Sequence, residues 1–147
     1  MDRRCRILVL GGWLLVAGAC GGSDVTSPSL PESTTTPDAA PSISESWTDT
    51  VPIGGMVWYS FSMAQRGTVQ LTLLSVNGRS VPPDATLGLA VGVLSGSSCA
   101  TPAPTSAQAG SAPQLTGTYD AGLHCASVSD VGELVAPAVV SLAVAHP

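Results

Sequence analysis

The feature that most constrains this chain is a period-two alternation of apolar and polar side chains between residues 47 and 147. In residues 68–74, for example, Val69, Leu71 and Leu73 alternate with polar neighbours. Successive side chains of a β-strand point to opposite faces, so such alternation predicts strands, and no stretch here combines helical periodicity with helix caps. We therefore expect an all-β, antiparallel, jelly-roll-like β-sandwich. The predicted strands span residues 47–51, 56–63, 68–74, 86–94, 115–119, 123–128 and 138–145.

The same alternation predicts which side chains share the core. One face of each strand collects the large apolar residues, and these faces are expected to pack together between two sheets. The predicted core consists of Tyr59, Phe61, Val69, Leu71, Leu73, Leu87, Leu89, Val91, Val140, Leu142 and Val144.

The strand at 86–94 has an unusual second face. Val93 is expected to point inward with the other large residues, whereas the opposite face holds only Gly88, Ala90 and Gly92. Either another segment packs closely on this face, or it lies bare and is the place where a ligand binds. Residues 99–113 show no periodicity and are expected to form a loop.

The first 46 residues do not resemble a folded domain. Residues 1–6 are basic and residues 7–19 form an apolar run of 13 residues, too short for a membrane-spanning helix, which needs about 20. This pattern predicts a signal peptide at residues 1–19 and export of the rest. Residues 20–46 are rich in Ser, Thr, Pro and Gly and are expected to be a disordered linker, which leaves 47–147 as the β-sandwich domain.

The end of the apolar run decides how the protein is processed. The sequence Ala17-Gly18-Ala19-Cys20 resembles the lipobox of bacterial lipoproteins. That resemblance implies that the Cys20 thiol carries a diacylglycerol and becomes the mature N-terminus, so that the protein is anchored to a membrane of the cell envelope. The alternative is ordinary cleavage after Ala19, which would release a soluble secreted protein.

Charge and cysteine content narrow the function further. After Cys20 the chain holds nine acidic residues and two arginines, a net charge of −7, so it lacks the basic surface with which proteins bind nucleic acid.

The cysteines predict one disulfide. Cys5 lies in the predicted signal peptide, and with Cys20 assigned to the lipid, only Cys99 and Cys125 remain in an oxidising compartment. We expect them to form a disulfide, because a metal or redox site would need more ligands or closer spacing.

Two segments resemble the bacterial pre-peptidase C-terminal (PPC) type domain. They are the aromatic-rich strand with its Gly-Thr-Val continuation, residues 58–74, and the Leu-x-Leu-x-Val strand, residues 87–93. The resemblance extends over roughly 47–147. It implies a non-catalytic β-sandwich module of the kind attached to secreted enzymes, some of which bind polymers.

No catalytic residue, cofactor or metal site is predicted. The chain has two histidines: His124 is expected to be a structural residue in a strand, and His146 to lie in a disordered terminus. No G-x-S-x-G motif or Ser-His-Asp set is present. Whether the loop carboxylates bind calcium is left open; the candidates are Asp120, Asp130 and Glu133.

Three aromatic residues complete the candidates. Trp47, Trp58 and Tyr59 either belong to the core or form an exposed strip that binds sugar or protein.

Taken together, these features lead us to expect a lipid-anchored, non-enzymatic envelope protein whose sandwich interacts with a protein or polysaccharide. The alternatives are a small-ligand-binding lipoprotein and, with less support, a hydrolase accessory.

Overall fold

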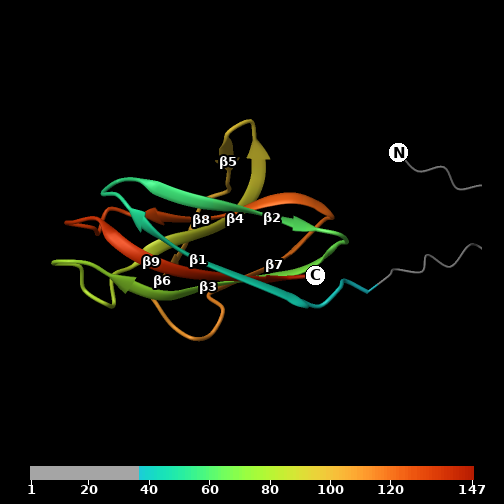
Figure 1. Cartoon of the computed structure of the whole chain (residues 1–147), viewed down its shortest axis with the longest axis horizontal. Helices are drawn as coiled ribbons and strands as arrows, with labels where there is room; N and C mark the ends of the chain where they lie inside the picture. The colour runs from blue at the N-terminus through green and yellow to red at the C-terminus, as the bar shows by residue number, and fades with distance from the viewer. Residues whose placement is uncertain (1–36) are drawn as a thin grey trace, which may run out of the picture. The chain divides into compact units, whose positions relative to one another are not determined.

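The computed structural model describes residues 37–147, and these form two antiparallel β-sheets packed face to face (Figure 1). The predicted β-sandwich is therefore confirmed. The predicted signal peptide, Cys20 and the predicted linker as far as residue 36 lie outside the described residues. Within residues 37–147 no helix is long and apolar enough to span a membrane. The strands are β1 (Ile43–Val51), β2 (Met56–Met63), β3 (Gly67–Asn77), β4 (Leu87–Ser95), β5 (Ser98–Ala100), β6 (Thr105–Ala107), β7 (Leu115–Tyr119), β8 (Gly122–Asp130) and β9 (Ala138–His146).

The strand order places the first and last strands of the domain side by side. One sheet has the order β1-β9-β3-β7, and the other has the order β2-β8-β4-β5, with β6 also paired to β4. Every pair of named strands is antiparallel. β1 and β2 are consequently the outermost strands of their sheets, and they lie next to each other along one side of the sandwich.

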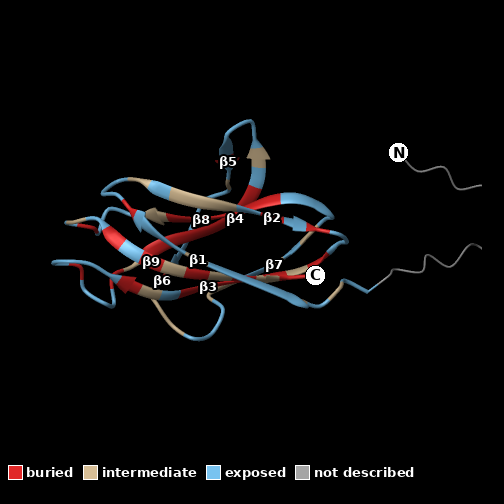
Figure 2. Ribbon diagram, in the orientation of Figure 1, coloured by how far each residue is buried: buried red, intermediate tan, exposed pale blue. Residues whose placement is uncertain are grey.

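The core follows the alternation of the sequence closely. Ten of the eleven predicted core residues are buried, at most 3% exposed, and they meet between the sheets (Figure 2). Tyr59 is the exception, because β2 lies at the edge of its sheet and leaves this ring half-buried. Burying large aliphatic side chains stabilises the fold by about 1.5–3 kcal/mol each, so this cluster is the main source of stability.

Two irregularities interrupt the regular alternation. The pairing of β3 with β9 shifts register between Leu73 and Ser75, so that Val76, rather than Ser75, is the next buried residue after Leu73. A bulge of this kind adds one residue to one strand and so resets the alternation. Val93, predicted to point inward, is 54% exposed, because the end of β4 and β5 form a hairpin that projects away from the sandwich (Figure 1).

The boundaries of some observed strands differ from the predicted ones. β1 begins at Ile43 rather than at residue 47, so residues 43–46 belong to the sheet and not to the linker. Ala39 already pairs with Gly67 in an isolated bridge. The sequence gives little sign of this, since residues 43–46 bury almost no apolar surface and are held by the backbone ladder with β9. Likewise, the loop expected at 99–113 contains β5 and β6, two three-residue strands that pair with β4.

Candidate interaction surface at the edge of the sandwich

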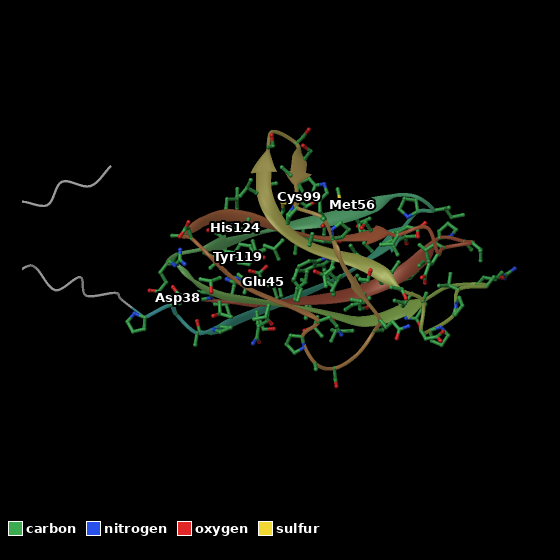
Figure 3. The ribbon with its side chains drawn as sticks, turned by 180° about the vertical axis from the view of Figure 1, so that it is seen from behind. Asp38, Glu45, Met56, Cys99, Tyr119 and His124 are labelled. Carbon is green, nitrogen blue, oxygen red and sulfur yellow. A yellow bond between two sulfur atoms is a disulfide. The ribbon has the colours of Figure 1, made fainter. Side chains whose placement is uncertain are left out.

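The two cysteines of the domain form the expected disulfide. Cys99 on β5 is bonded to Cys125 on β8, with their Cα atoms 5.9 Å apart. Figure 3 shows Cys99 at the base of the projecting hairpin. Cys125 lies opposite Gly92 of β4, so the disulfide ties the β4–β5 hairpin to strand β8 in the body of the sheet.

The small-residue face of β4 is covered by the chain itself. A Cβ atom placed on Gly92 would collide with the Ala100 carbonyl oxygen, and one on Gly88 would lie 2.8 Å from the Cβ of Pro104. Ala90 between them is buried. The segment after the hairpin therefore packs directly on this face, and of the two possibilities raised by the sequence, close packing is correct. The face is not an open binding site.

The three loop carboxylates considered for calcium are not brought together. Asp120 and Asp130 lie just before the start and at the end of β8, respectively, and Asp120 pairs with Arg66 at 2.8 Å. The carboxylate of Glu133 accepts the Thr86 N–H at 3.1 Å. Among residues 37–147 no group of three or more acidic, His or Cys side chains is placed to hold a metal ion.

Asp130 instead organises two loops at one end of the sandwich. Its Oδ2 accepts the N–H of Gly54 at 2.8 Å, and its Oδ1 accepts those of Gly132, Glu133 and Leu134 at 2.8–3.1 Å. These hydrogen bonds stabilise the carboxylate, and the bond from Gly54 has the largest effect. They outweigh partial burial, which raises the pKa, and hold the pKa of the Asp130 carboxyl below its ordinary value of 3.8. The carboxylate thus links the β1–β2 turn to the β8–β9 loop.

We expect Asp130→Ala to lower the free energy of unfolding by about 1–2 kcal/mol, because four backbone N–H groups lose their acceptor. The depressed pKa gives the sign of the pH effect: the contribution is present above the unfolded-state pKa and is lost as the pH falls through the folded-state pKa. Urea denaturation between pH 7 and pH 2.5 measures both quantities. Asp84→Ala is the control, since no side-chain hydrogen bond from Asp84 is present in the described structure. Equal stability losses in the two variants would contradict the assigned role.

Both histidines are structural. His124 is 7% exposed; its Nε2 donates to the Asp120 carbonyl oxygen at 2.8 Å, and its ring packs against Phe61 and Tyr119. Figure 3 shows His124 and Tyr119 at the same end of the sandwich as Glu45. His124 is therefore buried in a strand, as predicted, although its Nδ1 has no hydrogen-bond partner in the described structure. The expectation that His146 lies in a disordered terminus is wrong. The residue is 1% exposed at the end of β9, because β1 pairs with that strand along its whole length.

The three aromatic candidates do not form one strip. Trp47 on β1 and Tyr59 on β2 pack against each other with ring centroids 4.4 Å apart, and both are half-buried. Trp58 comes directly before Tyr59 in β2 and therefore points to the opposite face of its sheet. The aromatic pair thus closes the side of the sandwich where the two edge strands meet.

Two carboxylates flank this aromatic pair. Glu45, Trp47 and Asp49 lie opposite the core residues Val144, Leu142 and Val140 of β9, so all three point to the inner side of β1. The Tyr59 hydroxyl donates to Asp49 Oδ2 at 3.3 Å, and Glu45 Oε1 lies 3.2 Å from His146 Nε2. Partial burial, together with the Asp49 carboxylate, raises the pKa of the Tyr59 hydroxyl. We call Glu45, Trp47, Asp49 and Tyr59 the acidic–aromatic edge.

The acidic–aromatic edge was only partly visible in the sequence. The sequence offers Trp47 and Tyr59 as candidates, but Glu45 falls outside the predicted strand at 47–51 and Asp49, inside it, belongs to no recognisable motif. The period-two spacing Glu45-x-Trp47-x-Asp49 is the signal that would have placed the three side chains on one face. No family model, curated protein or solved structure matches the chain, so the site is interpreted from its own geometry.

Proposed function

We propose that this protein is exported, is anchored through a lipid on Cys20 to a membrane of the cell envelope, and binds a protein or polymer there through its non-catalytic β-sandwich. The observation that carries the binding role is the acidic–aromatic edge, where two half-buried rings lie beside two exposed carboxylates. Aromatic rings that remain partly accessible are enriched in interaction surfaces.

The state of the histidines supports a non-catalytic role. A general base must reach a substrate proton, directly or through one water. Both histidine rings are instead buried and held by contacts within the domain. The resemblance of residues 47–147 to PPC-type modules favours the same interpretation.

Export and anchoring have a direct test in the two cysteines of the N-terminal segment. Cys20→Ala is expected to leave the protein unprocessed or released, because the thiol that receives the acyl chains is gone; two or more chains give stable anchoring. Cys5→Ala is the matched control and should remain processed and anchored. Membrane fractionation with detection of the acylated N-terminal peptide measures the result. Membrane retention and normal processing of Cys20→Ala would refute lipidation.

The binding role is tested with the full-length, detergent-solubilised protein and purified envelope fractions. Trp47→Ala is expected to reduce the amount of bound envelope material at least about tenfold, the loss typical of a central aromatic contact. Ser46→Ala, one residue away but pointing to the other face of β1, should bind normally. Urea denaturation first establishes that both variants are folded. Equal binding by a folded Trp47→Ala variant would remove the acidic–aromatic edge from the function.

A further inference from the structure

We propose that the occupant of this edge is an extended segment of a partner protein that carries lysine or arginine side chains, and that it binds by adding a strand beside β1. This inference rests on the proposed function and names the partner class for the same site. It joins two observations: the unpaired side of β1 and the two carboxylates on it, of which Glu45 contacts His146 and neither pairs with an arginine.

β1 is a long and regular edge strand. Its nine residues pair with β9 from Ile43 to Val51 without a register shift, and its other side has no strand beside it among the described residues. Natural sheets protect such edges with proline, bulges or charged side chains, and lysine is especially common. β1 contains no proline, lysine or bulge, and its charged side chains are the two carboxylates Glu45 and Asp49, which oppose pairing with an acidic strand but not with a basic one. Figure 2 shows it exposed along most of its length. The Thr50 N–H donates to Asp49 Oδ1 at 2.7 Å, and the other outer backbone groups of β1 have no described partner, so an added strand can pair along it.

The charge of β1 selects among possible strands. Glu45 and Asp49 lie two residues before and after Trp47, about 7 Å from it along the strand. The described part of the chain has two arginines, and neither forms an ion pair with these carboxylates. Arg66 is bonded to Asp38 and Asp120, at 2.9 and 2.8 Å.

A second copy of this chain is a poor occupant. An antiparallel pairing of two β1 strands centred on Trp47 would place Glu45 of each copy opposite Asp49 of the other, and directly opposed like charges are destabilising. The carboxylates that disfavour self-pairing in this register favour a basic strand, and rejection of the wrong partner in this way gives specificity. Lysine or arginine side chains on such a strand would meet the carboxylates and the exposed part of the Trp47 ring.

A neutral polysaccharide is the competing occupant, since aromatic rings also bind sugars. The free backbone ladder and the two carboxylates favour the peptide, because a sugar uses neither the strand geometry nor the negative charge. Attraction between charges also weakens with salt, whereas stacking of a sugar on an aromatic ring does not depend on it in this way.

The test titrates processed full-length protein in detergent with nine-residue peptides that alternate lysine and threonine. We expect binding that weakens at least about tenfold between 20 and 500 mM salt and at least about tenfold in Glu45→Gln/Asp49→Asn. Asp84→Asn, which removes an exposed carboxylate from the β3–β4 loop, should bind within about twofold of wild type. Peptide binding should slow hydrogen exchange in β1 and leave the other edge strand of its sheet, β7, unchanged.

A backbone N-methylated version of the same peptide separates strand addition from simple charge attraction. Loss of its binding supports pairing with β1, and equal binding overturns it. A matched glutamate–threonine peptide that binds equally well, or neutral glycan oligomers that bind where the basic peptide does not, would also overturn the inference. If no peptide binds but envelope capture still depends on Trp47, the partner class is wrong and the proposed function stands. If that capture is also absent, both are wrong.

Discussion

Replacing Leu71 by alanine is expected to lower the free energy of unfolding by roughly 2–5 kcal/mol, the range for deleting a buried leucine side chain. Leu71 is fully buried on β3, and its strand lies between β9 and β7, where it pairs with Val144 and Leu115. The cost includes both lost apolar burial and the cavity that remains, since strands on both sides limit how far the backbone can relax. Urea denaturation followed by tryptophan fluorescence measures the change.

Leu74→Ala is the matched control on the same strand. Leu74 points to the outer face of β3 and is 45% exposed, so its truncation should change the free energy of unfolding by no more than about 0.5 kcal/mol. The pair of variants therefore tests which face of β3 is buried. If the two leucines cost the same, Leu74 is as buried as Leu71 and the described burial of β3 is wrong.

Removing the disulfide is expected to have the next largest effect. Cys99 and Cys125 close a loop with a sequence separation of 26, and the chain-entropy model gives roughly 3.5 kcal/mol for a loop of this length. The double variant Cys99→Ala/Cys125→Ala avoids leaving a single reactive thiol. Its stability should be the same with and without reductant, whereas the wild type should lose stability on reduction.

The loss of stability after removal of the disulfide should be concentrated in one part of the domain. The disulfide holds β5 and the segment that covers Gly88 and Gly92, so hydrogen exchange should rise most in β5 and β6. The amides of β3 lie in the other sheet and should retain more protection. A uniform rise in exchange across both sheets would show that the bond supports the whole domain rather than this covering segment.

The candidate site illustrates where inference from sequence stops. Asp120, Asp130 and Glu133 lie close together in the chain, but the extended strand β8 separates the first from the other two. Conversely, Trp47 and Tyr59 became neighbours because β1 and β2 are the edge strands of different sheets, an arrangement that no local pattern specifies.

The sequence by itself determined the fold class, the buried faces of strands such as β3 and β9, and the pairing of the two cysteines of the domain. These depend on local geometry and simple counting: alternate residues of a strand point to opposite sides, and two cysteines have one possible partner each. Only the tertiary structure decided which strands lie at an edge and which faces are covered. Burial depends on neighbours distant in the chain. At the edge of the sandwich the same alternation therefore leaves Tyr59 half-buried, and Glu45 and Asp49 exposed on the inner side of β1. In the other sheet, the segment that follows β5 packs on Gly88 and Gly92.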